Sequence, residues 1–129
     1  EFKYGDGALT GKAGLLDHLD KMHKVIGDPD LMAQLRESTE ASFNIKLQLG
    51  LIPSIKHEIS ISDSQPIILF VIANHKPVSK ALRKEVEELK SNADGLEVRF
   101  ALAHYLGYGL YNQNILTLEE FMRLPGVSE

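Results

Sequence analysis

The feature that most constrains the fold is an unbroken apolar run at residues 67–73, Ile-Ile-Leu-Phe-Val-Ile-Ala. It contains no charge and is rich in β-branched and aromatic side chains, and Pro66 and Pro77 lie close to its two ends. A run of this length and composition is typical of a strand buried on both faces, in a sheet that helices cover. It therefore predicts the central strand of an α/β domain.

The composition excludes several classes of protein. The chain has 129 residues, enough for one domain with a core and too few for two ordinary ones. It has no cysteine, which excludes thiolate metal sites and cysteine nucleophiles and fits a reducing, cytoplasmic location. No apolar run approaches the roughly 20 residues that span a bilayer, so we expect no membrane partner. A net charge of -4 predicts no general attraction to nucleic acid, so DNA contact requires a local basic patch.

Apolar residues recurring with the helical period predict helices on both sides of the central run. Asp28 before Pro29 is a typical N-cap, and Thr117 with Glu120 forms a capping box. We therefore expect helices over residues 12–26, 29–49 and 78–91, and a short helix that begins at Leu118 and ends before Pro125.

Strands are predicted where polar and apolar residues alternate, and at the continuous apolar run. We expect His57 on the apolar side of one of them, as a buried histidine with a hydrogen-bond partner. The order strand, helix, strand over residues 67–104 predicts a βαβ unit with parallel strands and a right-handed crossover. The fold class is therefore α/β, a small mixed sheet with flanking helices in a single domain, with strands over residues 1–4, 55–61, 67–73 and 96–104, and a short strand among the turn residues of 107–114.

Two stretches contain the residue types of a binding site without the required spacing. Residues 5–13 are rich in glycine and contain a lysine, as a phosphate-binding loop does. Asp6, however, stands where the first glycine is required, and Ala13 where the hydroxyl is required. His18 and His23 are five residues apart, and no His-Glu-x-x-His motif is present. We expect a Gly-rich turn that leads into a helix, and no histidine metal site.

Four basic residues gather around the start of the third predicted helix, and they are candidate phosphate contacts: Lys76, Lys80, Arg83 and Lys84. A helix N-terminus with added cations is suited to bind an anion. Glutamates follow at once within residues 85–88, so a solvated amphipathic face is the alternative explanation.

The remaining candidate is Glu1-Phe2-Lys3 on the first predicted strand. Residues two apart on a strand share a face, so Glu1 and Lys3 should point the same way and Phe2 the opposite way. A carboxylate beside an ammonium suits metal-assisted phosphodiester hydrolysis, since the carboxylate helps hold Mg²⁺ and the lysine orients water and offsets charge at the phosphate. The alternative is that these two residues are a charged chain end.

A strand with Glu-x-Lys, then a helix, then an apolar core strand resembles the back half of the PD-(D/E)XK nuclease superfamily, the restriction endonuclease-like fold. The resemblance covers roughly residues 1–104. It implies that Glu1 is a metal-binding carboxylate, that Lys3 is the catalytic lysine, that the cofactor is Mg²⁺ and that the substrate is DNA. It also implies that the family's first strands, with a further aspartate ligand, precede this chain, so that residues 1–129 are the C-terminal part of a larger nuclease-like domain.

Three functions follow as hypotheses. In the first, the chain is part of a metal-dependent DNA endonuclease and is inactive by itself, because one carboxylate cannot hold the metal. The second is a non-catalytic α/β interaction module that binds a partner, or its own twin, through an open sheet edge. The third is a small nucleotide-binding domain with its site at the carboxyl ends of the parallel strands, near residues 74–76 and 104–105.

Overall fold

The computed structural model describes residues 1–53, 57–73, 78–103 and 111–125. They form two compact units, one made of Glu1–His23 with Pro66–Glu129 and the other of Lys24–Gln65. We call the first the sheet unit and the second the α2 unit. None of the helices in these ranges is long and apolar enough to cross a membrane.

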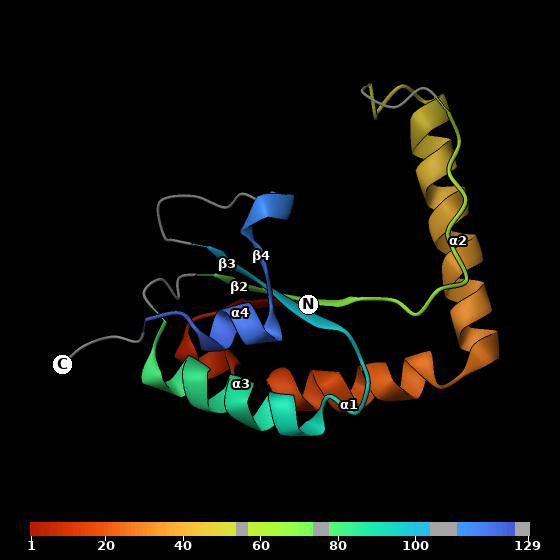
Figure 1. Ribbon diagram of the computed structural model, residues 1–129. Coiled ribbons are helices and arrows are strands. Elements are labelled where there is room, and N and C mark those ends of the chain that lie inside the picture. The colour runs from red at the N-terminus through yellow and green to blue at the C-terminus, as the bar shows by residue number, and fades with distance from the viewer. Residues whose placement is uncertain (54–56, 74–77, 104–110, 126–129) are drawn as a thin grey trace. The chain divides into compact units, whose positions relative to one another are not determined.

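A small mixed sheet organises the sheet unit (Figure 1). Its order is β1 (Phe2–Tyr4), β2 (Ile68–Ala73), β3 (Val98–Ala103) and β4 (Ile115–Thr117). The first three strands are parallel and β4 is antiparallel to β3. The apolar run therefore lies at an inner position of the sheet, as predicted, and the α/β class with a small mixed sheet is confirmed.

The predicted βαβ unit is also confirmed. Helix α3 (Lys80–Asn92) connects β2 to β3, and these two strands pair in parallel from Ile68 with Val98 to Ala73 with Ala103. The inward face of α3 is fully buried, with Leu82, Val86 and Leu89 at 0% exposure. A parallel connection needs such a crossover helix, because the chain must return to the starting end of the sheet.

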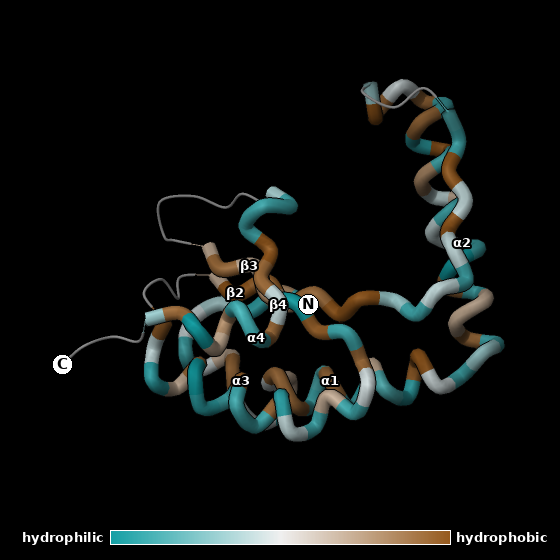
Figure 2. Tube along the Cα trace, in the orientation of Figure 1, coloured by the Kyte–Doolittle hydropathy of each residue, from teal (hydrophilic) through white to brown (hydrophobic). Residues whose placement is uncertain are grey.

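Helices α1 (Leu15–Ile26), α3 and α4 (Leu118–Met122) lie on one face of the sheet (Figure 1). The aromatic residues of this layer join three elements: Phe70 and Phe100 are register partners with ring centroids 6.0 Å apart, and Phe121 of α4 lies 4.9 Å from Phe100. All three rings are fully buried. Figure 2 shows the hydrophobic residues concentrated in β2 and β3, where this core lies.

The opposite face of the sheet is only partly buried, so the expectation that β2 is buried on both faces is wrong for this side. Leu69 and Val71 are half-buried there. Phe2, the register partner of Val71, is 55% exposed, and Tyr4 is 59% exposed. An apolar strand can thus have one fully covered and one partly open face.

Helix α1 (Leu15–Ile26) begins three residues later than predicted because its approach is a tight turn. A Cβ on Gly14 would lie 2.6 Å from the carbonyl oxygen of Leu9, so only glycine fits there. The amide of Leu15 donates to that same carbonyl at 2.8 Å. A 3₁₀ turn (Asp6–Ala8) precedes this loop, in agreement with a Gly-rich turn.

Of the C-terminal elements, the helix lies where it was predicted, and the short strand lies just after residues 107–114, within which it was predicted. A 3₁₀ turn (Asn112–Asn114) leads into β4 and then α4, which begins at Leu118 as predicted. The capping box is present: the hydroxyl of Thr117 accepts from the amide of Glu120 at 3.2 Å, and the Glu120 carboxylate accepts from the amide of Thr117 at 2.8 Å. The Glu120 carboxylate also accepts from the Thr117 hydroxyl at 2.9 Å. The hydrogen bonds that the carboxylate accepts from the Thr117 amide and hydroxyl lower the pKa of Glu120, because they favour its ionised form.

In the α2 unit, helix α2 (Pro29–Gln48) begins as predicted, with the Asp28 carboxylate accepting from the amides of Asp30 and Leu31 at 3.1 and 3.0 Å. Polar side chains of α2 also hold the extended residues that follow. The Asn44 amide group bonds both the N–H and the C=O of Ile59, at 3.1 and 3.3 Å.

The strand predicted at 55–61 is therefore wrong for its described part, residues 57–61, which form no strand. Their backbone groups are taken by α2 side chains in place of a neighbouring strand: Asn44 bonds Ile59, and the Glu40 carboxylate accepts from the amide of Ile61. The expectation of a buried His57 is also wrong, because His57 is exposed. Residues 55 and 56 lie outside the described ranges.

One buried carboxyl group predicts a pH-dependent stability. Glu85 of α3 is only 9% exposed, and burial, with a smaller contribution from Glu88, raises its pKa above the ordinary 4.5. A raised pKa means that the folded state binds the proton more tightly than the unfolded state. The resulting stabilisation is present below about pH 4.5 and is lost as the pH rises through the raised pKa.

We therefore expect Glu85→Gln to raise the melting temperature at pH 7, where it removes a buried charge, and to raise it less at pH 4. Thermal unfolding of both proteins at the two pH values measures this. Glu87→Gln, on the exposed side of the same helix, is the matched control, and its melting temperature should differ little from that of the wild type at either pH. An equal gain for Glu85→Gln at both pH values would contradict the assignment.

Candidate functional site

Strand β1 places Glu1 and Lys3 on the helix-covered face of the sheet and Phe2 on the other, as the alternation of a strand predicts. Lys3 pairs in register with Ile72, whose side chain is fully buried, and Lys3 itself is only 4% exposed. A lysine this deep is rare unless its ammonium has partners. The partners of Lys3 therefore decide what this position can do.

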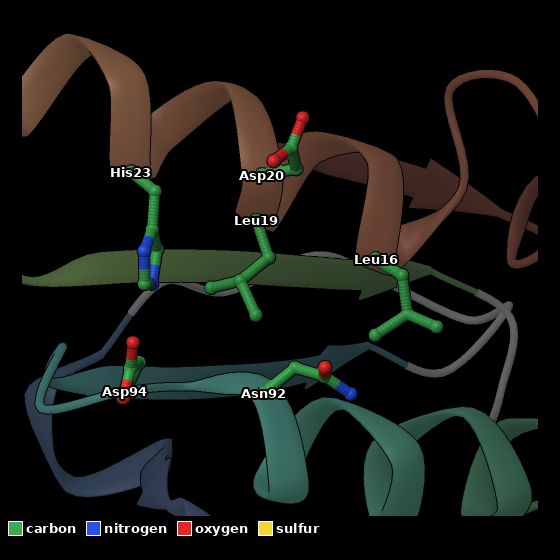
Figure 3. Close-up of a pocket in the computed structure, with 6 residues that line it drawn as sticks. All are labelled: Leu16, Leu19, Asp20, His23, Asn92 and Asp94. Carbon is green, nitrogen blue, oxygen red and sulfur yellow. The ribbon is translucent and has the colours of Figure 1, made fainter.

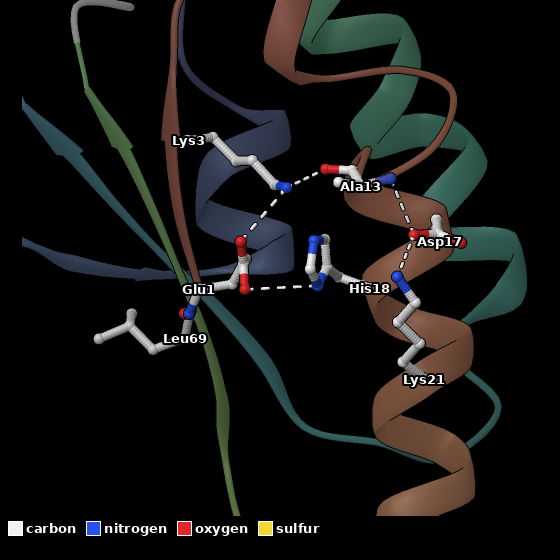
Figure 4. A network of polar contacts seen from close by, with 7 residues as sticks. All are labelled: Glu1, Lys3, Ala13, Asp17, His18, Lys21 and Leu69. Atoms are coloured by element: carbon white, nitrogen blue, oxygen red, sulfur yellow. Dashed lines mark hydrogen bonds and ion pairs between the residues drawn. The ribbon is translucent and has the colours of Figure 1, made fainter.

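Glu1, Lys3 and His18 point toward one another and form a polar cluster, with Glu1 and Lys3 at the start of the chain and His18 from α1 (Figure 4). The Lys3 ammonium lies 3.3 Å from one carboxylate oxygen of Glu1, and the ring Nδ1 of His18 lies 3.3 Å from the other. The Lys3 ammonium also donates a hydrogen bond to the carbonyl oxygen of Ala13. The buried cation is thus compensated by one carboxylate and one backbone carbonyl.

The loop before α1 is shaped around this cluster. Ala13 has a φ of 65°, in the left-handed region that residues other than glycine rarely adopt. Its carbonyl accepts from Lys3, and its amide donates to the Asp17 carboxylate at 2.8 Å. Because both polar groups of this peptide segment are bonded to side chains, the uncommon backbone conformation is held from two sides.

Asp17 connects the cluster to the surface of α1. Lys21 donates to its carboxylate at 2.7 Å, and this hydrogen bond together with that from the Ala13 amide lowers the pKa of Asp17. Lys21 is 54% exposed, in contrast to Lys3. The two lysines therefore differ in kind: Lys21 is a solvated surface cation, and Lys3 is a buried one with a fixed direction.

The cluster by itself does not fit a magnesium site. Mg²⁺ takes oxygen ligands in octahedral geometry, usually one or two carboxylates with waters. Over residues 1–53, 57–73, 78–103 and 111–125, no group of three or more His, Cys, Asp or Glu is placed to hold a metal ion. Both oxygens of Glu1 are already close to nitrogen atoms of Lys3 and His18.

The candidate phosphate contacts on α3 are not gathered into one site among the described residues. Arg83 points to the C-terminal segment, where its guanidinium donates to the carbonyl of Met122 at 3.1 Å and to that of Leu124. Lys84 lies 3.8 Å from Glu88 on the exposed side of the helix. Lys80 is exposed, and Lys76 lies outside the described residues.

The N-terminus of α3 is also used within the protein. The hydroxyl of Ser79 accepts from the amide of Leu82 at 3.1 Å and donates to the Asp6 carboxylate at 2.8 Å. This contact ties the turn after β1 to the start of α3. It also brings a negative charge to the helix end that a phosphate would need.

A hollow of about 260 Å³ lies between α1 and the end of α3 (Figure 3). The His23 ring nitrogen Nε2 is 3.2 Å from the carbonyl oxygen of Ala93, which holds the ring at one side of this hollow. The lining combines two leucines with polar groups, and it consists of Leu16, Leu19, Asp20, His23, Asn92 and Asp94. None of these lining residues belongs to the cluster of Glu1, Lys3 and His18.

The sequence did not identify His18 as a member of the candidate site, because His18 and His23 were considered only as metal ligands. The contact of His18 with Glu1 joins residues that are 17 positions apart, and no local spacing signals it. The carbonyl of Ala13 was likewise invisible in the sequence. The strand ends near residues 74–76 and 104–105, where a nucleotide was expected, lie outside the described residues.

No protein-family model matches the chain, and neither a curated protein nor a solved structure is significantly similar to it. The geometry of the cluster is therefore the basis on which a function is proposed.

The burial of Lys3 predicts different effects for two substitutions. Lys3→Met keeps the apolar stem and should change the free energy of unfolding by about 1 kcal/mol or less, because Glu1 is 28% exposed and stays hydrated. Lys3→Ala leaves a cavity beside Ile72 and should cost about 2 kcal/mol or more. Urea unfolding of the three proteins measures both, and equal losses for the two variants would show that the ammonium, not the stem, contributes most.

Proposed function

We propose that the chain carries the Glu-x-Lys strand of a DNA endonuclease of the PD-(D/E)XK type, with Glu1 and Lys3 in its active site. The observation that carries the proposal is a lysine at 4% exposure whose ammonium is 3.3 Å from the carboxylate of Glu1, the residue that precedes β1. The element order supports it as well, because β1 is followed by α1 and pairs in parallel with the core strand β2.

The proposed role of Lys3 is to orient the attacking water and to offset the negative charge that develops at the phosphate. Its direction is set before substrate binds, by Glu1 and by the carbonyl of Ala13. Such preorganisation is valuable because the donor does not have to reorient during the reaction. His18 would hold the Glu1 carboxylate from its other oxygen.

Magnesium remains part of the proposal only for a longer protein. The cluster supplies one carboxylate, so further oxygen ligands must come from outside the described residues. We therefore expect the purified 129-residue chain to be inactive. Incubation of supercoiled plasmid with this chain and Mg²⁺ or Mn²⁺ should leave the plasmid intact, and cleavage by it would contradict this expectation.

The test of the proposal uses the natural protein that contains this chain. Plasmid cleavage in Mg²⁺ should fall by at least about 100-fold in Lys3→Met, because a charge-stabilising donor is lost while the fold is kept. Lys90→Met is the matched control, since it removes an exposed lysine from the last turn of α3 and should cut at the rate of the wild type. Equal cleavage by the Lys3 variant and the wild type would remove Lys3 from the mechanism.

A second candidate, a non-catalytic interaction module, is favoured by the exposed side of β1. Among the described strands β1 is terminal and pairs with β2. Its outward residues Phe2 and Tyr4 are 55% and 59% exposed, which is high for aromatic side chains in a sheet. An open edge beside an apolar surface suits the addition of a strand from another chain.

Amide hydrogen exchange of Phe2 and Tyr4 tests this second candidate, because the backbone groups of the alternate residues Glu1 and Gly5 are the ones that bond β2. If another copy adds a strand to β1, protection of these amides should increase with protein concentration, while the amides of β3 in the sheet interior stay unchanged. Protection that is independent of concentration would count against self-association through this edge.

A further inference from the structure

Helix α2 has apolar residues on two opposite sides, as their positions along the helix and their burial indicate. Figure 2 shows hydrophobic and hydrophilic residues mixed along its length. One side faces the extended segment within its own unit, where Asn44 and Glu40 bond residues 59 and 61. The other side is exposed. We call it the α2 seam, and it consists of Leu31, Leu35, Ser38, Ser42, Ile45 and Leu49.

The apolar members of the seam are exposed to an unusual degree. Leu31 is 42% exposed, Leu35 50%, Ile45 56%, and Leu49, at the C-cap, 68%. Single exposed leucines are normal on protein surfaces, but a row along a whole helix is not. Burying these side chains against a partner would be favourable, at roughly 25 cal/mol for each Å² removed from water.

The spacing of the seam is that of a coiled coil. From Leu31 to Leu49 the positions advance in steps of four, three, four, three and four residues. This alternation has a mean of 3.5 residues and is the a/d pattern that keeps one face of a helix against another helix. The occupant that fits the seam is therefore a second helix with the same spacing.

We propose that the occupant is the α2 seam of a second copy of this chain, packed antiparallel. Around its centre the seam reads the same in both directions: two large apolar residues, two serines, two large apolar residues. In an antiparallel pair Leu31 meets Leu49, Leu35 meets Ile45, and Ser38 meets Ser42. Large residues thus face large ones, and the small ones face each other at the two-fold axis.

Ser38, one of the two serines at the centre, is compatible with a buried interface. The hydroxyl of Ser38 donates to the carbonyl of Leu35 at 3.1 Å, so this group has a hydrogen-bond partner within its own helix. Small side chains also let two helix backbones approach closely. The centre of the seam can therefore be covered without leaving this hydroxyl unsatisfied.

The helix dipoles and the charges at the two ends of α2 favour antiparallel over parallel packing. The first turn of α2 carries Asp30 and the last turn carries Lys46. Antiparallel helices place the acidic start of one beside the basic end of the other and also oppose their dipoles. Parallel helices would bring the like ends of the two helix dipoles together. The positions flanking the seam contain one charged residue, Lys46, and are otherwise uncharged: Met32, Gln34, Thr39, Ala41 and Gln48.

Sedimentation of the 129-residue chain tests the dimer. The wild type should sediment as a dimer at high concentration, and Leu35→Glu combined with Ile45→Glu should be monomeric with unchanged circular dichroism, since both sites are exposed. Leu51→Glu is the control for adding charge to an exposed leucine, because Leu51 is 66% exposed and lies outside the seam; it should stay dimeric. A wild type that stays monomeric at its highest soluble concentration overturns the proposal.

Disulfide cross-linking tests the direction, and the chain is suited to it because it has no cysteine. A mixture of Leu31→Cys and Leu49→Cys proteins, distinguished by mass, should cross-link to each other under mild oxidation. The 18 residues between these positions span about 27 Å of helix, so neither variant should cross-link to itself. Cross-links between identical variants would show a parallel pair, and an absence of any cross-link would place the interface elsewhere; either result overturns the antiparallel seam.

Discussion

The burial of β2 between β1 and β3 is the interaction on which the rest of the sheet unit depends. Phe70 of β2 and Phe100 of β3 lie side by side in register, and Phe121 of α4 packs on Phe100 at 4.9 Å. These contacts join residues that are 30 and 21 positions apart in the sequence. Because a parallel pair cannot form without its crossover helix, the same contacts also hold α3 against the sheet.

The candidate site is a consequence of this packing. Strand β1 pairs with β2 and so places every second side chain among the buried residues under the helices. A lysine at such a position must bring partners or lose its charge. Lys3 has both a carboxylate and a carbonyl, and the second of these requires the left-handed backbone of Ala13. A cation with so fixed a direction is suited to act on a charged substrate, and it can equally be a structural device that joins β1 to the loop before α1.

The α2 unit is held together by a different kind of interaction. Its helix has little of an interior to cover, and polar side chains hold the segment that follows it. Asn44 bonds the N–H and the C=O of Ile59 as a neighbouring strand would, which is why an alternating sequence is extended there without belonging to a sheet. With that side engaged, the apolar residues on the other side of α2 are the ones that remain for a partner.

Local patterns in the sequence determined most of the elements. The uncharged run of β2, the cap at Asp28 and the capping box at Thr117 depend on side chains acting on nearby backbone, so they are readable from short stretches. The alternation of β1 likewise determined that Glu1 and Lys3 share a face. The tertiary structure decided the contacts between distant residues: that His18 approaches Glu1, that Arg83 bonds the end of α4, and that residues 57–61 pair with a helix. Such contacts depend on how whole helices and strands pack against one another, and the spacing of residues along the chain does not determine this packing.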